Sequence, residues 1–333
     1  MSSDLLRARL APLPGHDPAA ADAVHERAAN LLRPSGALAW LDEIAAWVAG
    51  WQHTTTPAVH RPAALIFAGD HGVAAATKVS AYPTGITQAL FDAYRQGRST
   101  IAAFAKIAGA SVSAIDVGIG RPTGDIRYEA ALSHDRFDEI VGIAFGAVDA
   151  LDCDLLVLGE IGIGNTTPSA AIAASLAGGE TAAWVGRGTG VDDEGLARKR
   201  SAVQESVRRI AGITDPIEIL REVGGSELVA IAAATVAARH RSIPVVLDGY
   251  VVTSAVLPLA MVNPAALDHC MVGHCSTEPG HRKLLERLGK RPLLDLDMRL
   301  GEGSGAMAAV PLIAMACAGV TSVPTYEEWF GPA

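Results

Sequence analysis

The chain has 333 residues, of which 50% are hydrophobic and 19% are charged. This balance excludes a disordered or fibrous protein and predicts a globular chain with a sizeable core. Lysine and arginine number 27 against 36 acidic residues, which gives a net charge of −9. Because an acidic chain is a poor partner for nucleic acid or for an anionic membrane, we expect it to bind neither.

The four cysteines indicate a reducing compartment. They are too sparse for a disulfide framework and no signal-peptide pattern precedes them, so we expect a cytoplasmic protein. Cys270, His274, Cys275 and His281 lie close together in the sequence. Their C-x4-C and H-x6-H spacing matches no common zinc site, and we therefore expect no metal here.

The first 60 residues contain two helical patterns, at residues 19–32 and 37–51, and no strand candidate. We expect residues 1–60 to form a small helical lobe. The C-terminal helix, at about residues 306–333, is expected to join it, because chain ends commonly lie near each other. Residues 61–305 would then form the main domain.

Within the main domain, short apolar runs bounded by glycine alternate with helical patterns. The clearest helix covers residues 193–211 and places Leu196, Val203 and Val207 on one face. This alternation predicts an α/β fold with a doubly wound, mainly parallel, Rossmann-like sheet, whose ligands bind at the carboxyl ends of the strands. The candidate strands are residues 64–68, 112–117, 155–158, 243–247, 270–272 and 292–294.

Residues 303–326 carry no charge and are long enough to span a bilayer. They consist mainly of small and hydroxyl residues, Pro311 interrupts them, and no basic residue follows. We therefore expect a buried core helix rather than a membrane span.

The third candidate strand is followed by Gly-Glu-Ile-Gly-Ile-Gly-Asn-Thr-Thr-Pro at residues 159–168. A capping threonine and an early proline predict a helix N-terminus, whose free N–H groups favour a phosphate or a carboxylate. An ordinary tight turn explains the glycines equally well. Glu160 does not help to bind an anion, and we interpret it as serving a reacting centre nearby.

A second glycine-rich loop, at residues 186–190, leads into the basic helix through Asp192, Asp193 and Glu194, which complement the helix dipole. Lys199 lies two turns further along that helix. It could reach back to a phosphate as a point charge, and the alternative is a solvated surface lysine.

A third loop, Gly-Glu-Gly-Ser-Gly at residues 301–305, places Glu302 where a strand leads into an apolar helix. Glu302 could simply be an acidic residue at a helix start. Burial against the apolar helix would instead raise the pKa of its carboxyl toward neutrality and make it a usable base. Because Glu160 and Glu302 both follow predicted strands, the pair suggests transfer at a sugar carbon.

Residues 80–83, Ser-Ala-Tyr-Pro, precede a helix and could form a wall against an aromatic ligand. An Xaa-Pro turn explains them equally well. Polar residues that follow the other strands outline the rest of one rim: Asp70, His71, Asp248, Gly249 and Ser276.

Taken together, these segments resemble the nicotinate-nucleotide:dimethylbenzimidazole phosphoribosyltransferase family of cobalamin nucleotide-loop assembly. The resemblance covers about residues 64–316 and rests on AGDHGV, SAYP, GEIGIGNTT, GRGTGVDDEGLARK, VLDGYVVT, STEPGH and RLGEGSGA, in that order. It implies transfer of the 5-phosphoribosyl group from nicotinate mononucleotide to 5,6-dimethylbenzimidazole or a related azole. The products would be nicotinate and α-ribazole 5′-phosphate, with inversion at C1′. A Rossmann-type catalytic domain, a small helical domain and a homodimer are implied as well.

The resemblance also implies a role for each site residue. Glu302 is the expected general base, and Glu160 is the second active-site carboxylate. Nicotinate leaves from a pyridinium, so the reaction of these small molecules needs neither metal nor cofactor. The expected donor-binding residues are Gly162, Asn165, Thr166, Gly188, Lys199, Gly249 and Ser276. The expected azole-binding residues are Ser80, Tyr82, Pro83 and Gln88.

Two departures from the family pattern concern the acceptor side. Thr87 and Gln88 are adjacent, whereas the family often has a residue between them, and Cys275 stands where arginine is commoner. These departures leave the choice of azole open.

Features of the sequence also suggest three other functions. Residues 191–194 suggest a magnesium-dependent phosphoribosyltransferase, although that motif should end a strand and here opens a helix. Glycines at 118, 120 and 124 suggest a nicotinamide dehydrogenase, although the third is misplaced for the dinucleotide-binding motif. A catalytically inactive azole- or nucleotide-binding protein is the third alternative, because a fold does not imply an activity.

Overall fold

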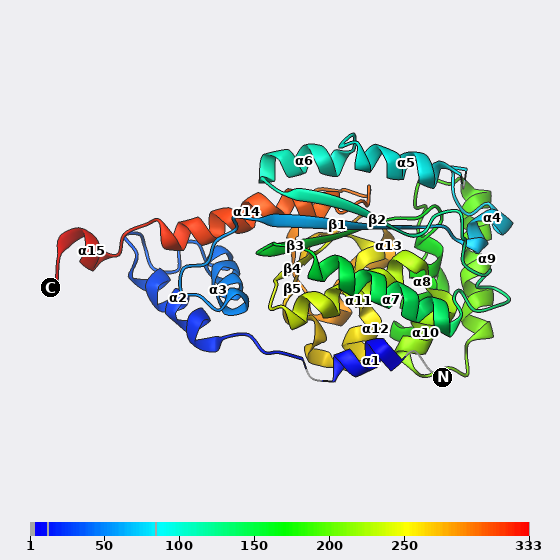
Figure 1. The fold of residues 1–333 in the computed structure, drawn as a ribbon, viewed down its shortest axis with the longest axis horizontal. Coiled ribbons are helices and arrows are strands. Elements are labelled where there is room, and N and C mark those ends of the chain that lie inside the picture. Colours follow the sequence, from blue (N-terminus) through cyan, green and yellow to red (C-terminus); the bar gives the residue numbers. More distant parts are fainter. Residues whose placement is uncertain (1–3, 12, 84, 333) are drawn as a thin grey trace.

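The computed structural model of the protein describes residues 4–11, 13–83 and 85–332. A single sheet of six strands, in the order β2-β1-β3-β4-β5-β6, lies at its centre (Figure 1). Every neighbouring pair is parallel, which confirms the predicted α/β class and Rossmann-like sheet. Each predicted strand is present: β1 (Pro62–Gly69), β2 (Ser111–Gly118), β3 (Leu155–Ile161), β4 (Val245–Leu247), β5 (Cys270–His274) and β6 (Pro292–Leu294).

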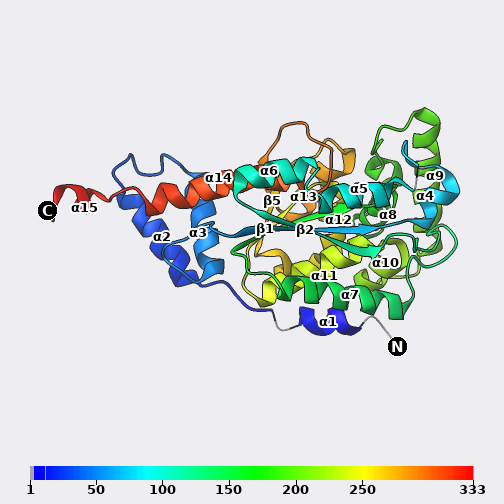
Figure 2. The same cartoon turned by 45° about the horizontal axis from the view of Figure 1, so that its top comes forward.

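Helices cover both faces of the sheet (Figures 1 and 2). On one face lie α5 (Ile86–Arg95), α6 (Thr100–Ala108) and α14 (Ser304–Thr321). On the other lie α7 (His134–Asp149), α8 (Thr166–Ala177), α11 (Ser226–His240) and α12 (Tyr250–Val262). The remaining helices are α1 (Asp4–Leu10), α2 (Pro18–Asn30), α3 (Trp40–Gln52), α4 (Gly72–Thr77), α9 (Asp193–Arg209), α10 (Pro216–Val223), α13 (Pro279–Leu288), α15 (Tyr326–Phe330) and the 3-10 turns Thr181–Trp184 and Pro264–Leu267.

The apolar runs of the central strands follow from this double coverage. Alternate residues of a strand point to opposite faces. Ile66 and Ala68 of β1 accordingly join the core under α5, α6 and α14, whereas Leu65 and Phe67 join the core under α7 and α11. Because both faces are buried, the strand has no polar alternation, and the sequence shows a continuous apolar run.

The order of the strands creates a switch point between β1 and β3. The chain leaves β1 for helices on one face and leaves β3 for helices on the other, although the two strands are neighbours. Open parallel sheets bind ligands in the crevice at such a point, beyond the carboxyl ends of the strands. Glu160 pairs in register with Phe67 there.

Helices α2 and α3 and the end of α14 lie together at one end of the long axis of the molecule, at the left in Figure 1. Val24, Ala45 and Val320, one from each helix, share a small apolar core. Arg27 fastens the C-terminal segment, because its guanidinium donates to the carbonyl of Val320 at 3.0 Å and pairs with Glu328 at 2.8 Å. By contrast α1 packs on the α7 and α11 side of the sheet. The division into residues 1–60 with 306–333 and residues 61–305 stays a prediction.

Helix α14 is long and apolar enough to cross a membrane by length and composition, and among the described residues it is the one helix that meets this test. Met307, Val310 and Ile313 are nevertheless buried in the core beneath α6. The helix therefore packs as a core helix, as its small-residue composition predicts.

Candidate active site

Glu160 is buried at the end of β3, with 8% of its surface exposed. Burial raises the pKa of its carboxyl to about 8, and the charge of Glu227 adds to the increase. The side-chain amide of Asn165, at the start of α8, donates to Glu160 and opposes part of that shift. Glu160 is therefore held in place by a donor, and its carboxyl titrates well above the usual carboxyl range.

Glu302 reaches the same place from the turn before α14. Its φ of 67° lies between Gly301 at 84° and Gly303 at 85°, so three successive residues adopt the left-handed conformation. This turn presses its backbone onto Gly159, where a Cβ atom would lie 2.3 Å from the carbonyl oxygen of Glu302. Glycine is required at 159 for that close approach.

The two carboxylates share one site. The Glu302 charge raises the pKa of Glu160, though less than burial does, and a Cβ on Gly301 would lie 2.7 Å from Oε1 of Glu160. Burial also raises the pKa of Glu302, as the sequence predicts, and the nearby charge of Asp248 adds to this. Two residues 142 positions apart in the chain thus converge at the switch point because both belong to the carboxyl edge of one sheet.

Asp248, after β4, holds the Glu302 turn against the sheet. Its carboxylate accepts hydrogen bonds from the backbone N–H groups of Gly303, at 3.2 Å, and Ala306, at 2.9 Å. These are free donors at the N-terminus of α14, where a negative charge is favoured. His274 of β5 lies 3.4 Å from the same carboxylate.

Lys199 is almost fully buried on α9, with 1% exposed, and its Nζ donates to Oγ1 of Thr166 at 2.8 Å. Burial lowers the pKa of this lysine to about 8. A Cβ on Gly188 would lie 3.0 Å from Nζ, so the second glycine-rich loop passes directly over the ammonium group. Lys199 is therefore no solvated surface lysine, and with Thr166 it lies at the N-terminus of α8, where an anion is favoured.

Glu278 connects this anion cradle to the end of β5. Its Oε1 accepts from the backbone N–H of Gly188 at 2.9 Å, and its own N–H donates to Oγ of Ser276 at 3.3 Å. Gly249 lies beside Ser276, since a Cβ there would be 3.5 Å from the Cβ of Ser276. Five of the predicted donor-binding residues are thus linked by contacts, directly or through Glu278: Thr166, Lys199, Gly188, Ser276 and Gly249. Gly162 lies deeper, against Glu227 and His71.

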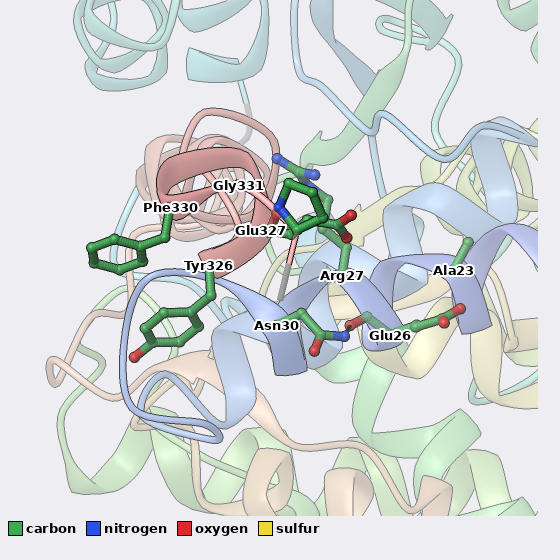
Figure 3. A pocket seen from close by; sticks show the side chains of 10 residues that line it. Ala23, Glu26, Arg27, Asn30, Tyr326, Glu327, Phe330 and Gly331 are labelled. Atoms are coloured by element: carbon green, nitrogen blue, oxygen red, sulfur yellow. Dashed lines mark hydrogen bonds between the residues drawn. The ribbon is translucent and has the colours of Figure 1, made fainter.

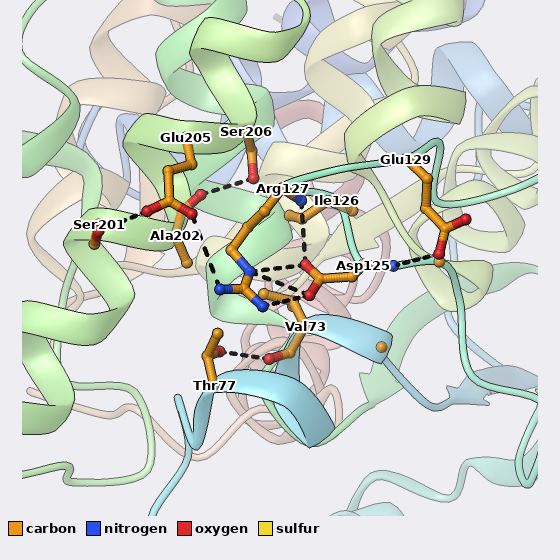
Figure 4. Close-up of polar contacts among 12 residues, drawn as sticks. Val73, Thr77, Asp125, Ile126, Arg127, Glu129, Ser201, Ala202, Glu205 and Ser206 are labelled. Carbon is orange, nitrogen blue, oxygen red and sulfur yellow. Dashed lines mark hydrogen bonds and ion pairs between the residues drawn. The ribbon is translucent and has the colours of Figure 1, made fainter.

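The loop after β2 braces α9, the helix that carries Lys199 (Figure 4). Arg127 pairs with Asp125 at 2.5 Å and lies 3.9 Å from Glu205 of α9. Glu205 also accepts from Ser201 at 2.9 Å. The guanidinium is partly shielded from water, which strengthens these charge-assisted contacts.

The predicted azole-binding residues are only partly brought to this site. Ser80 contacts Thr189 of the second glycine-rich loop, hydroxyl to hydroxyl, at 3.1 Å. Tyr82 is 53% exposed and Pro83 is exposed beside it. Gln88 lies on the surface of α5 and donates to Asp92 along the same helix at 3.1 Å. The azole roles of these four residues stay a prediction.

The cysteines and histidines that lie close together in the sequence, Cys270, His274, Cys275 and His281, each have other partners. His281 accepts from the backbone N–H of Ser276 at 2.8 Å and contacts Thr253 at 3.1 Å, and burial lowers the pKa of its imidazole to about 3. Cys275 lies 3.8 Å from the carbonyl of Ser276. In the described ranges no three His, Cys, Asp or Glu side chains are grouped as metal ligands would be.

The motifs behind two alternative functions have local structural explanations. Asp192 caps α9 by accepting from the N–H of Gly195 at 2.8 Å, so residues 191–194 open a helix and end no strand. After β2 the chain runs through residues 119–133 without a helix, and α7 begins only at His134. The strand, glycine turn and helix of a dinucleotide site are therefore not formed there.

Two further contacts escaped the sequence analysis. Burial raises the pKa of the Tyr94 phenol on α5, and the nearby charge of Glu302 adds to the increase. His71 and Glu227, both fully buried at their side chains, meet at 2.6 Å beneath Gly162. Nothing local marks Tyr94 or Glu227: Tyr94 has the position of a core aromatic on an amphipathic helix, and Glu227 that of a residue that complements a helix dipole.

A surface hollow of about 1030 Å³ lies elsewhere, between α2 and α15 (Figure 3). Its walls include Arg27, Asn30, Tyr326 and Phe330, and none of the candidate site residues lines it. The polar cluster at the switch point is therefore the better candidate for chemistry.

We expect Gly159→Ala to disable the site more than the fold. The new Cβ would displace the backbone of Glu302, so the melting temperature should fall by several degrees, the scale of a small overpacking strain. Turnover should fall at least tenfold, since a carboxylate moved by an ångström loses its geometry. Gly142→Ala is the matched control, because a Cβ there meets nothing within 4 Å. Equal activity of the two variants would contradict the close contact between Gly159 and the backbone of Glu302.

Comparison with known proteins shows the family to which the chain belongs. A family model described as a phosphoribosyltransferase matches residues 13–329. A protein of Mesorhizobium japonicum named nicotinate-nucleotide–dimethylbenzimidazole phosphoribosyltransferase is 47% identical over 313 residues, which cover 94% of this chain and 93% of the relative. A protein of the same name from Methylocella silvestris is 45% identical, with 98% of this chain and 95% of its own length covered.

Solved structures agree with the sequence relatives. The crystal structure of CobT from Thermus thermophilus superposes with a TM-score of 0.89 at 38% identity, over 95% of this chain and 99% of that one. The sheet, the glycine-rich loops and the matching family model define the class of the protein as a phosphoribosyltransferase. Within that class, the chain belongs to the nicotinate-nucleotide–dimethylbenzimidazole phosphoribosyltransferase family, which confirms the resemblance drawn from its motifs.

Proposed function

We propose that this protein transfers the 5-phosphoribosyl group of nicotinate mononucleotide to 5,6-dimethylbenzimidazole or a related azole. The observation that carries the proposal is the convergence of Glu160 and Glu302 at one switch point, beside the cradle of Lys199 and Thr166, in a chain of this family. The products are nicotinate and α-ribazole 5′-phosphate.

The cradle binds the donor phosphate. Lys199 supplies a positive charge, and Thr166 and Gly188 supply hydrogen-bond donors around it. In the structure the carboxylate of Glu278 takes the N–H of Gly188, which supports an anion-binding role for that backbone group. Holding the phosphate fixes C1′ at the carboxyl edge of the sheet, where the two glutamates lie.

Glu160 stabilises the positive charge on the donor and on C1′. Its pKa of about 8 leaves the carboxyl largely protonated at neutral pH in the free protein. A bound pyridinium ring favours the ionised form, because an opposite charge nearby lowers the pKa of a carboxyl. The donor thus generates the negative charge that stabilises an oxocarbenium-like transition state.

Glu302 acts as the general base on the acceptor. One azole nitrogen attacks C1′ while the C1′ bond to nicotinate breaks, and the electron pair of that bond neutralises the pyridinium nitrogen. The proton on the other azole nitrogen passes to Glu302. Direct displacement of this kind inverts C1′ and converts the β-linked donor into an α-linked product.

We further propose that the protein works as a cytoplasmic homodimer. The net charge of −9, the four free cysteines and the α14 core helix fit a cytoplasmic enzyme. Exposed aromatic residues on α15, among them Trp329 at 63% and Phe330 at 72%, offer apolar area for a second copy. Sedimentation analysis tests the dimer directly.

Incubation of the purified protein with nicotinate mononucleotide and 5,6-dimethylbenzimidazole tests the reaction. We expect release of nicotinate and, by proton NMR of C1′–H, an α-configured product, with turnover unchanged by a metal chelator. Donor binding without product would favour the inactive nucleotide-binding protein. Turnover that a chelator abolishes and magnesium restores would favour the metal-dependent alternative.

A further inference from the structure

His71 and Glu227 form a hydrogen-bonded pair in the interior, directly behind the candidate active site. His71 follows β1, and Glu227 lies in the first turn of α11. Their side chains are fully buried, and Nε2 of His71 lies 2.6 Å from Oε1 of Glu227. In the described part of the chain, the other polar atom of each side chain, Nδ1 or Oε2, has no hydrogen-bond partner. Each side chain is therefore oriented by the other.

Three glycines pack against this pair. A Cβ on Gly162, after β3, would lie 2.6 Å from Oε1 of Glu227 and 2.9 Å from Nε2 of His71. A Cβ on Gly225 would lie 3.0 Å from Nδ1 of His71, and one on Gly69 would lie 3.0 Å from Oε2 of Glu227. None of these three glycines has a left-handed φ, so their backbone conformation does not require glycine. The pair itself leaves little or no space for a Cβ, and the backbones of β1, β3 and α11 meet around it.

Gly162 begins the turn that carries the polar groups of the site. Its carbonyl accepts a hydrogen bond from the backbone N–H of Asn165 at 3.1 Å. The side-chain amide of Asn165 donates to Glu160, and the next residue, Thr166, accepts from Lys199 at 2.8 Å. A shift of Gly162 would therefore move Asn165 relative to Glu160 and change the spacing between that carboxylate and the anion cradle.

We propose that His71 and Glu227 are positioning residues for the reaction, and that their hydrogen bond supports the turn at residues 162–165 so that Asn165 stays directed at Glu160. This inference rests on the proposed function. A buried charged pair is often no more stabilising than apolar residues of the same volume, so packing alone gives no reason for it. A hydrogen bond is directional, and it fixes the two side chains beneath Gly162 in one arrangement.

The test replaces both partners at once, with His71→Met and Glu227→Met in one chain. Methionine adapts to a similar space, and removal of both polar groups leaves no buried charge without a partner. Because His71→Met alone leaves the Glu227 carboxylate buried without its partner, we expect its melting temperature to fall much further than that of the double variant. In the folded double variant kcat should fall at least tenfold, since a misplaced carboxylate loses its geometry. KM for nicotinate mononucleotide should stay within about twofold, because Lys199 and Thr166 still hold the phosphate.

Two controls separate position from stability and from charge. His269→Met removes a fully buried histidine at the amino end of β5, away from the site, and should lower the melting temperature with kcat per folded protein unchanged. Removal of the Glu227 charge favours the ionised form of Glu160, which the reaction needs, so lost charge does not by itself lower kcat. Wild-type kcat in the folded double variant overturns the inference.

Nitrogen-15 NMR of the asparagine side chains measures the position of the turn without turnover. The chain has three asparagines, Asn30, Asn165 and Asn263. The amides of Asn30 and Asn263 donate to backbone carbonyls elsewhere in the fold. In the double variant the Asn165 signals, assigned by Asn165→Ala, should move while the other two pairs stay, and unmoved Asn165 signals overturn the inference. If the wild type transfers no phosphoribosyl group, the proposed function fails, and the Asn165 signals still decide whether the pair supports the turn.

Discussion

Glu302→Gln is expected to lower turnover by about two orders of magnitude or more while donor affinity stays nearly intact, the scale of losing a general base. The amide keeps the shape of the side chain, and the turn should hold its geometry because Asp248 fastens it through the N–H groups of Gly303 and Ala306. What the variant loses is the ability to take a proton. Steady-state kinetics with both substrates varied separate this loss of kcat from any change in KM.

The pH profile gives a second readout for the same variant. In the wild type, the raised pKa of Glu302 places the acid limb of kcat/KM above the usual carboxyl range, because activity needs the ionised form. The residual activity of Glu302→Gln should lack that limb. Glu286→Gln, an exposed glutamate on α13, is the control and should behave as wild type. Unchanged turnover in Glu302→Gln would remove Glu302 from the mechanism.

Local patterns were enough to predict the sheet and the three loops at its carboxyl edge. A buried parallel strand needs an apolar run, and a helix N-terminus after it needs small and capping residues, so β3 and α8 are visible in the sequence. The predicted strand at residues 155–158 stopped early, because Gly159 and Glu160 interrupt its apolar run. Pairing with Phe67 and Ala68 of β1 extends β3 through Ile161.

The burial of Lys199 depends on contacts between helices that are distant in the sequence. The apolar stripe of Leu196, Val203 and Val207 predicts that Lys199 lies on the polar part of its helix. The structure also buries Lys199 against α8, on a face with Gly195 and Ser206. Small residues at this spacing are the one local signal of a closely packed face.

Tyr94 and Glu278 had no comparable signal. Each acts on a residue far away in the sequence, Tyr94 on Glu302 and Glu278 on Gly188. Which residues meet across such distances depends on the order of strands in the sheet. That order is set by tertiary packing, and a single sequence without relatives does not reveal it.

Lys199→Met is expected to weaken donor binding by about 2 kcal/mol, or roughly 30-fold, the scale of a hydrogen bond to a charged group. Methionine fills similar space, so the contact of α9 with α8 should survive. The kinetic signature is a raised KM for nicotinate mononucleotide with kcat nearly kept, because the phosphate is held equally in ground and transition states. Arg200→Met, exposed on the same helix, is the matched control.

The pH dependence of donor binding gives a second test of Lys199 as the ligand of the donor phosphate. Burial lowers the pKa of Lys199 to about 8, so its positive charge is lost as the pH rises through that value. The donor phosphate is already a dianion there, since its second pKa is about 6. The wild-type KM for the donor should therefore rise above pH 8, whereas the KM of Lys199→Met, high throughout, should show no such rise. If the variant instead loses kcat with saturation unaffected, Lys199 serves the reacting centre rather than the phosphate.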